Sequence, residues 1–421
     1  MRKYILLGIG ILCMLIVFFF NSCGKEVINT NGDSHFTEDG YFIGDSSDTD
    51  SFVLCSPSRI KFYVEVSGSM NGFFRANKPT KFKADVWQIL SYYASAADGV
   101  TILTNDGTQG ATLPISKFQT QMNTGAFVSS ASTKVPIMLQ SILQNLDTEA
   151  GEVAVLISDM KYDPVGAAAP NVLLTQYSTD ISTIFGQFGK AICLIGATSE
   201  FLDKTGTSIC NTSPYYYLVM GKPDHVAELR NGISTLLVNN GSFIDNIESG
   251  FNYGSPTYTF GIPDNCYQLN DNEPTFLGYD PDFSDTCTVK LKIDLANYRW
   301  AISKKELFEQ AFQCKTLYGS EVKVGNVDIE IQNITDKVLK RTAIATVDLK
   351  LCHMTTDSEV IEWTLTLPDL DITEFAPYLE GLDPNDVTKS FSVENFIKGM
   401  FYGGVINKSL QPNYILISKK S

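Results

Sequence analysis

The chain has 421 residues, of which 44% are hydrophobic and 11% aromatic, so it is long enough to bury a sizeable core in two or three domains. Its formal net charge is −15, and no run rich in Lys or Arg follows residue 3. Because phosphate backbones are bound mainly by clustered positive charge, this composition argues against a nucleic-acid partner.

The N-terminus has the layout of an export signal. Arg2 and Lys3 form a short basic start, residues 4–20 are an almost unbroken apolar run, and Asn21-Ser22-Cys23 follows. A basic start, an apolar segment and a small residue before the cleavage point are typical of a secretory signal. A run of this length also permits an uncleaved membrane anchor, which is the alternative. Either arrangement places the rest of the chain outside the cytoplasm.

The end of this signal, Phe20-Asn21-Ser22-Cys23, resembles the lipobox of bacterial lipoproteins, although Phe20 stands where that motif usually has Leu, Val or Ile. The resemblance implies that a signal peptide of residues 1–22 is removed and that Cys23 carries the lipid. We therefore expect a protein anchored by lipid in the bacterial cell envelope, at the outer membrane, facing the periplasm or the outside. Residues 23–51 are rich in Asn, Gly, Ser, Asp and Glu, a composition typical of a flexible tether.

From residue 52 to 245 the pattern alternates between strands and helices. Strands are expected near residues 60–66, 100–103, 111–115, 152–157, 191–195 and 215–220, and helices near 82–97, 135–146, 172–188 and 226–238. Such alternation is typical of crossover units around a parallel sheet. The sequence thus predicts an α/β domain over 52–245, Rossmann-like, with a central, mostly parallel sheet covered by helices on both faces.

A different pattern follows in residues 250–421. Val289, Leu291 and Ile293 alternate with polar residues, and the same period of two recurs near 327–331, 343–351 and 363–367. This period, with polar turns between the segments, predicts a mainly antiparallel, sandwich-like β domain. A helix near 393–402 and a strand near 414–417 are expected to close the chain.

The most informative motif stands at the end of the first expected strand and reads Glu65-Val66-Ser67-Gly68-Ser69-Met70. It resembles the Asp-x-Ser-x-Ser motif of von Willebrand factor type A domains, in the variant that ends Ser-Gly-Ser-Met. The resemblance covers about residues 56–240 and implies a metal-ion-dependent adhesion site. In that family a threonine from a later loop and an aspartate at the end of a central strand complete the site. Thr133 and Asp159 match these two positions.

The predicted metal ligands are Glu65, Ser67, Ser69, Thr133 and Asp159, and the expected ion is Mg²⁺ or Mn²⁺. Mg²⁺ prefers oxygen ligands in octahedral geometry and usually keeps several waters. The carboxyl ends of strands are also where open α/β sheets bind ligands. An incomplete shell leaves one position for an acidic residue of a protein partner. Glu65 replaces the usual Asp and is one methylene longer, so the sequence leaves both a working and a lost metal site open.

Three functions follow from these observations. The leading hypothesis is a non-enzymatic, lipid-anchored envelope protein that mediates protein–protein interaction or adhesion through the metal site. The first alternative is a scaffold of an envelope complex in which the metal site is degenerate. The second is a hydrolase, which is weakly supported because neither Ser67 nor Ser69 lies in a Gly-x-Ser-x-Gly elbow. The chain offers only His35, His225 and His353 as a histidine base for such an enzyme.

Overall fold

The computed structural model describes most of the chain from residue 55 onwards. The described ranges are 55–104, 107–127, 134–162, 170–251, 256–261, 266–268, 276–279, 286–295, 298, 302, 304–330, 343–354, 356–379, 386–404 and 409–419. The predicted signal and tether, with Cys23, and the candidate ligand Thr133 lie outside these ranges. Within them, no helix is both long and apolar enough to cross a membrane.

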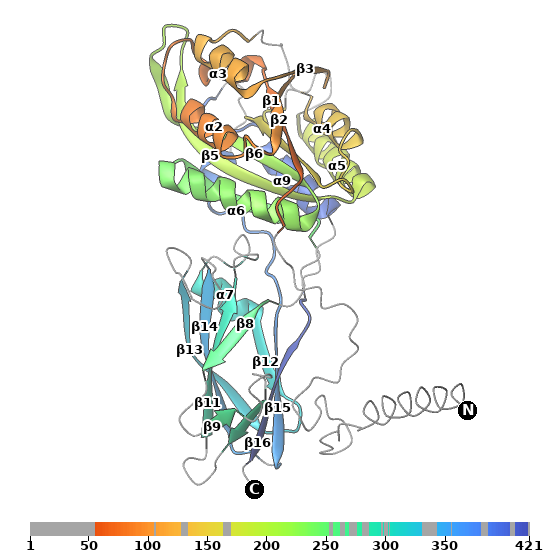
Figure 1. Cartoon of the computed structure of the whole chain (residues 1–421), viewed down its shortest axis with the longest axis vertical. Helices are drawn as coiled ribbons and strands as arrows, with labels where there is room; N and C mark the ends of the chain where they lie inside the picture. The colour runs from red at the N-terminus through yellow and green to blue at the C-terminus, as the bar shows by residue number, and fades with distance from the viewer. Residues whose placement is uncertain are drawn as a thin grey trace, which may run out of the picture.

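The α/β part of the chain comes first and lies above the β part in Figure 1. Its elements are β1 (Arg59–Glu65), the 3-10 helix η1 (Gly68–Gly72), α2 (Lys81–Tyr92), β2 (Ala97–Leu103), β3 (Gln109–Leu113), α3 (Ile115–Thr124), α4 (Val135–Gln144), β4 (Glu152–Ser158), α5 (Pro170–Phe188), β5 (Ala191–Leu202), β6 (Ser208–Gly221), α6 (Pro223–Asn240) and β7 (Phe243–Ser249). The expected strands and helices all occur, with α3 and β7 in addition. Helix α2 begins after Thr80, whose side chain accepts a hydrogen bond from the Lys83 amide, as N-cap residues do.

The seven strands form one mixed sheet in the order β3-β2-β1-β4-β6-β5-β7. Strand β1 is parallel to β2 and β4, but β6 is antiparallel to both β4 and β5. The expectation of a mostly parallel, Rossmann-like sheet is therefore wrong. The reason is the short turn at 203–207, where the Asp203 carboxylate accepts hydrogen bonds from the Thr205 and Thr207 amides. So short a connection joins antiparallel strands only, because parallel strands need a long crossover.

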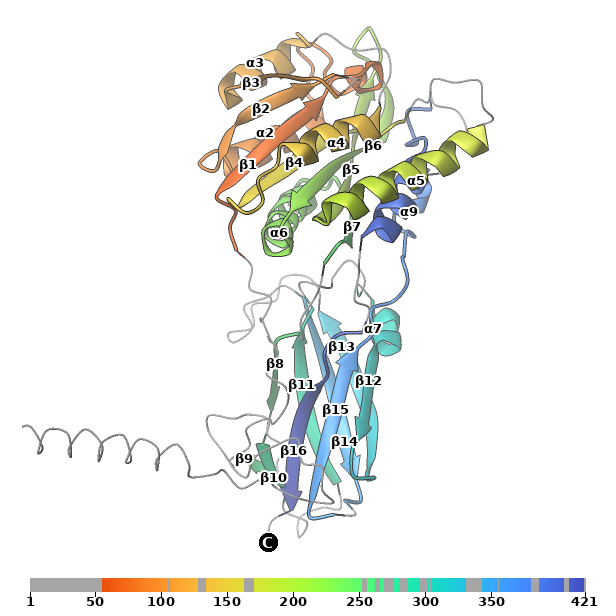
Figure 2. The same cartoon turned by 90° about the vertical axis from the view of Figure 1, so that its right-hand side faces the viewer.

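Helices cover both faces of this sheet, as expected for an α/β domain. Helices α2, α3 and α6 pack on one face, and α4 and α5 pack on the other (Figures 1 and 2). Strand β4 is buried along its whole length, with Val155 and Ile157 in the first core and Ala154 and Leu156 in the second. The uninterrupted apolar run of β4 thus follows from its central position between two helical layers.

The C-terminal part consists of two facing sheets. Its elements are β8 (Tyr258–Gly261), β9 (Cys266–Gln268), β10 (Phe276–Tyr279), β11 (Thr286–Asp294), α7 (Lys305–Ala311), β12 (Phe312–Thr316), β13 (Glu321–Glu330), β14 (Ile344–Cys352), β15 (Ser358–Leu365), α8 (Ala376–Leu379), α9 (Val393–Gly403) and β16 (Asn413–Lys419). The sheet orders are β12-β15-β16-β10-β9 and β13-β14-β11-β8, with mainly antiparallel pairs. Trp363 of β15 meets Tyr258 of β8 edge to face, with ring centroids 5.1 Å apart, so the two sheets share a core. The expected antiparallel β architecture is confirmed.

Helix α9 comes late in the sequence but packs on the α/β part, beside α5 (Figure 2). Phe396 and Met400 of α9 share a core with Tyr177 of α5. Gly399 permits the close approach, because a Cβ atom there would lie 2.5 Å from the carbonyl oxygen of Ser178. The division into two domains at 245–250 stays a prediction. The structure shows in addition that the chain returns to the α/β part, where α9 packs on α5.

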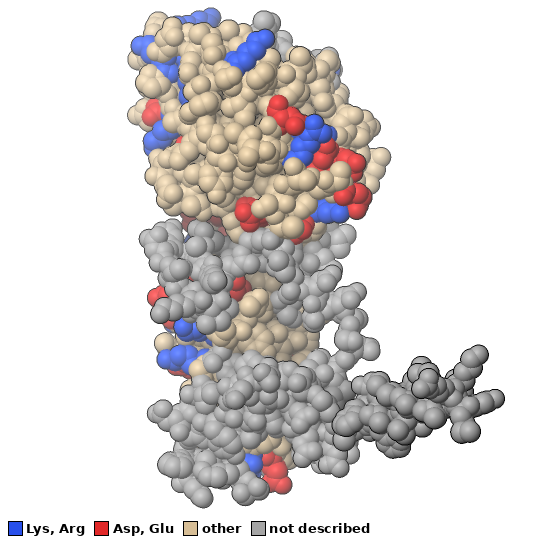
Figure 3. All heavy atoms as spheres, in the orientation of Figure 1, with Lys and Arg blue, Asp and Glu red and all other residues tan. Residues whose placement is uncertain are grey.

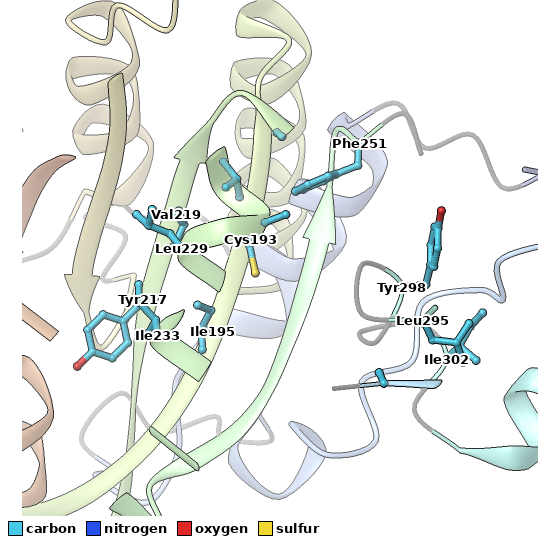
Figure 4. Packing of buried hydrophobic residues seen from close by; sticks show 14 of the residues in the cluster. Cys193, Ile195, Tyr217, Val219, Leu229, Ile233, Phe251, Leu295, Tyr298 and Ile302 are labelled. Carbon is cyan, nitrogen blue, oxygen red and sulfur yellow. The ribbon is translucent and has the colours of Figure 1, made fainter. Parts of the chain in front are cut away.

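The apolar core continues from one part of the molecule towards the other. Phe251 is buried just beyond β7, and Figure 4 shows it near β5, the strand that carries Cys193. Leu295, Tyr298 and Ile302 of the β part belong to the same cluster of buried residues. Continuous burial of this kind limits the freedom of the two parts to move as separate bodies.

Candidate metal-binding site

The predicted ligands converge at the carboxyl ends of β1 and β4. These strands are adjacent and parallel, and Val64 pairs with Ile157, so the terminal residues Glu65 and Ser158 lie side by side. The chain continues from β1 to β2 on one side, while β4 lies on the other side. Such switch points are where open α/β sheets bind ligands. The fold therefore brings together every predicted ligand that lies within the described ranges.

The two serine hydroxyls lie close together in the loop after β1. The Oγ atoms of Ser67 and Ser69 are 2.8 Å apart, which is hydrogen-bonding distance. Ser67 is buried, Gly68 is exposed and Ser69 is half-buried. The Ser69 hydroxyl also interacts with the carboxylate of Asp159 and favours its charged form, which lowers the pKa of that group. The loop thus brings two predicted ligands, Ser67 and Ser69, next to a third, Asp159, and it places Gly68 and Ser69 at the surface.

Asp159 is the least satisfied group of the site. Only 1% of the residue is exposed, and its Oδ1 accepts a hydrogen bond from the Lys161 amide at 3.2 Å. Its Oδ2 is buried and has no hydrogen-bond partner in the described part of the chain. Burial raises the pKa of Asp159, and the nearby Lys161 charge offsets this in part. Because a buried, unpaired carboxylate oxygen is unfavourable, this position fits a group that binds a cation.

A constrained turn holds Asp159 in place. The next residue, Met160, is fully buried and has a φ of 55°, in the left-handed region that non-glycine residues rarely adopt. The Met160 amide donates a hydrogen bond to the Ser158 hydroxyl at 2.7 Å, which stabilises the turn. Backbone strain of this kind is common at functional sites.

Glu65 is fully buried and oriented towards the α5 side of the sheet. Its carboxylate accepts a hydrogen bond from the Ser158 hydroxyl. Its charge helps to raise the pKa of the buried Tyr177 hydroxyl on α5, although burial is the larger cause. The Glu65 carboxylate is therefore engaged with the end of β4. Ser158 was not among the predicted site residues, although it directly precedes Asp159 at the end of the same apolar strand.

A C-terminal segment borders the site, which no sequence pattern indicated. The Lys161 ammonium group donates a hydrogen bond to the carbonyl oxygen of Asp386 at 2.7 Å. The Tyr162 amide donates to the Ser392 hydroxyl at 3.2 Å. Hydrogen bonds therefore join the turn that carries Asp159 to the segment before α9, at Asp386 and at Ser392.

The histidines within the described ranges lie elsewhere. His225 is at the opposite end of the sheet, near Gly151, where it forms a group of potential metal ligands with Cys55 and Asp224. His353 directly follows β14 in the β part. Neither of these two imidazoles is placed to act as a base for Ser67 or Ser69.

Comparison with protein-family models, with curated proteins and with solved structures finds no match to this chain. The resemblance to von Willebrand factor type A domains therefore rests on the motif residues. The functional argument depends on the geometry of the site.

Proposed function

We propose that the carboxyl edge of β1 and β4 binds a divalent cation, Mg²⁺ or Mn²⁺, and holds a protein partner through it. The observation that carries this proposal is the buried, unpaired Oδ2 of Asp159 beside Ser69. A cation would give this oxygen the partner that the described residues do not provide. Hydroxyl and carboxylate oxygens are the ligands that hard divalent cations prefer.

Each of the predicted residues would have its own role at the site. Ser67, Ser69 and Asp159 would hold the ion, and Thr133 is the further predicted ligand. Glu65 would add negative charge from the adjacent strand end. The bound ion would supply positive charge at the surface, which an acidic residue of the partner can complete. The protein would act as a non-enzymatic adhesion or interaction module, as in the von Willebrand factor type A family that its motif resembles.

The surface near this edge suits a protein partner. Helices α4 and α5 both begin at the carboxyl edge, and their first turns expose Ile137 and Val172. A protein interface combines apolar side chains with polar ones, so these two residues can contribute to a contact with the partner. On the face shown in Figure 3, the described Lys and Arg side chains are scattered among uncharged ones, which does not favour a nucleic-acid partner. The lipid anchor at Cys23 remains the predicted attachment to the membrane.

One observation favours a second candidate function, an envelope scaffold with a degenerate metal site. The Ser158 hydroxyl already satisfies one oxygen of the Glu65 carboxylate. If this hydrogen bond keeps Glu65 from the ion, the remaining ligands would bind it weakly. The same edge would then contact its partner without a metal.

Thermal melting of the detergent-solubilised protein with Mg²⁺, Mn²⁺ or a chelator tests the proposal. A ligand present at a hundredfold excess over its dissociation constant stabilises the folded state by about 2.7 kcal/mol. We expect this stabilisation in the wild type and in the control Asp328→Ala, which alters an exposed aspartate of β13. We expect Asp159→Ala to abolish it.

A pull-down from envelope extract then tests the interaction. We expect a partner that is retained in Mg²⁺, released by chelator and absent with Asp159→Ala, but retained by Asp328→Ala. Binding that ignores both chelator and Asp159→Ala would favour the scaffold. Metal-dependent melting without any chelator-sensitive partner would leave a metal site and remove the adhesion function.

A further inference from the structure

A separate cavity lies between α2 and α3, away from the candidate metal site. These two helices are neighbours at the top of the α/β part (Figure 1). The cavity has a volume of about 380 Å³, and its lining includes Lys78, Lys83, Trp87, Gln119 and Asn123. This volume lies in the lower part of the range of small-molecule sites.

Local hydrogen bonds fix the walls of the cavity. Asn77 adopts a left-handed φ of 54°, and its amide donates to the carbonyl oxygen of Asn123 at 2.8 Å, which ties the loop before α2 to the end of α3. The Thr80 hydroxyl accepts a hydrogen bond from the Lys83 amide and donates to the carbonyl oxygen of Phe73. The cavity is therefore formed by the fold and does not depend on the positions of surface side chains alone.

Lys83 is the unusual residue of this lining. It is 6% exposed, and its ammonium group donates to the carbonyl oxygen of Arg75 at 2.6 Å. Burial lowers the pKa of Lys83, and no described carboxylate is close enough to offset this effect. Even partial burial of an ammonium group without a counter-ion is unfavourable. By contrast, the buried guanidinium of Arg230 forms an ion pair with Glu248.

The rest of the lining suits an anion attached to a polar ring. It contains neither Asp nor Glu, and Lys78 adds a second cation. Trp87 is half-buried and offers an aromatic surface on which a ring can pack. The amides of Gln119 and Asn123 can each donate and accept hydrogen bonds.

We propose that this cavity binds a small anionic sugar, a sugar acid or a sugar phosphate. The anionic group pairs with Lys83, the sugar ring packs on Trp87, and the ring hydroxyls bind Gln119 and Asn123. The anionic group of the ligand supplies the negative charge that no described carboxylate provides near Lys83. This proposal is independent of the metal site.

Three ligands that share one ring test it: glucose, glucuronate and glucose 6-phosphate. Binding to the detergent-solubilised protein is measured by calorimetry and by the fluorescence of Trp87, one of three tryptophans in the chain. We expect at least one anionic sugar to bind about tenfold or more tightly than glucose, a difference of about 1.4 kcal/mol that one hydrogen bond to a charged group can supply. Tighter binding of glucuronate would indicate a site for a carboxylate, and tighter binding of glucose 6-phosphate would indicate a site for a phosphate.

Substitution of Lys83 separates a binding role from a structural one. Lys83→Met keeps an apolar chain of similar length, so we expect it to abolish the preference for the anion and to raise the melting temperature of the free protein. The control Lys117→Met alters an exposed lysine of α3 that does not line the cavity, and it should change neither property. If Lys83→Met does not fold, the milder Gln119→Ala and Asn123→Ala should each weaken binding of the anionic sugar. Equal binding of all three sugars, no binding of any, or unchanged binding in the folded variants would overturn the proposal.

Discussion

Ser158, the last residue of β4, donates a hydrogen bond to the carboxylate of Glu65, the last residue of β1. Both side chains are fully buried. Glu65 stands where von Willebrand factor type A domains, which its motif resembles, have Asp. Its carboxylate contacts the end of the neighbouring strand, β4. We expect the metal affinity of the proposed site to depend on this contact, because it holds Glu65 on the α5 side of the sheet.

Glu65→Asp should increase the metal-dependent rise in melting temperature. The shorter side chain is expected to release Ser158 and to stay closer to the loop that carries Ser67. Without metal, loss of a buried hydrogen bond to a charged group should destabilise the protein by about 1.5–3 kcal/mol. Melting curves with and without Mg²⁺ measure both effects. Ser158→Ala is the control, because it removes the hydrogen bond between residues 158 and 65 but leaves the Glu65 side chain unchanged. An identical metal response in all three proteins would show that Glu65 has no part in the site.

Asp159 should make stability depend on pH when no metal is present. Burial raises its pKa in the folded state above the unfolded value, while Lys161 and Ser69 oppose this. The stability linked to its proton is therefore present below the unfolded pKa and is lost as the pH rises through the folded pKa. We expect wild type to lose stability relative to Asp159→Asn between acid and neutral pH, as measured by urea unfolding in chelator. Mg²⁺ should reduce the loss, and a difference that is constant with pH would contradict the raised pKa.

Gly399→Ala should weaken the docking of α9 on α5. The added Cβ would lie 2.5 Å from the Ser178 carbonyl oxygen and 2.8 Å from the Cβ of Ile181, so the helices must separate. We expect a loss of about 1–3 kcal/mol in the free energy of unfolding, typical of overpacking. Lys398→Ala, at an exposed neighbouring position, should change it by less than about 0.5 kcal/mol. Equal stability of the two variants would mean that the helices can separate freely.

The buried ion pair between Arg230 and Glu248 should be sensitive to loss of one partner. Both side chains are almost fully buried. Arg230→Met alone should destabilise the protein by about 3–5 kcal/mol, because Glu248 would keep an uncompensated buried charge. The double variant Arg230→Met with Glu248→Leu should recover most of this loss. Chemical denaturation of the single and double variants measures the difference, and a double variant no more stable than the single one would rule out the charge as the cause.

Cys23 lies outside the described ranges, and its lipid remains a prediction of the sequence. The protein isolated from a bacterial membrane should partition into detergent and have a mass that includes acyl chains at residue 23. Cys23→Ala should lack the acyl mass, whereas Cys55→Ala, at an exposed cysteine, should keep it. The same mass difference from the bare polypeptide in wild type and Cys23→Ala would exclude this lipid assignment.

The sequence by itself determined the type of most elements and the face that each one buries. The unbroken apolar run ending at Ile157 indicated a central strand, and the polar residues directly after it indicated the edge at which Asp159 stands. The alternation of Val289, Leu291 and Ile293 likewise indicated a strand of an antiparallel sheet. These features are local, because side-chain period and burial depend on residues close together in the chain.

Only the tertiary structure decided how the elements are joined in space. Four features depend on residues that are far apart in sequence. They are the position of β6 between β4 and β5, the packing of α9 on α5, the contact of Ser158 with Glu65, and the absence of a carboxylate near Lys83. Local pattern limits such pairings but does not select among them. The selection depends on which arrangement buries the most apolar surface while every buried polar group finds a partner. Two ionisable side chains are left incompletely paired among the described residues: the Oδ2 of Asp159 has no hydrogen-bond partner, and Lys83 has no carboxylate as a counter-ion.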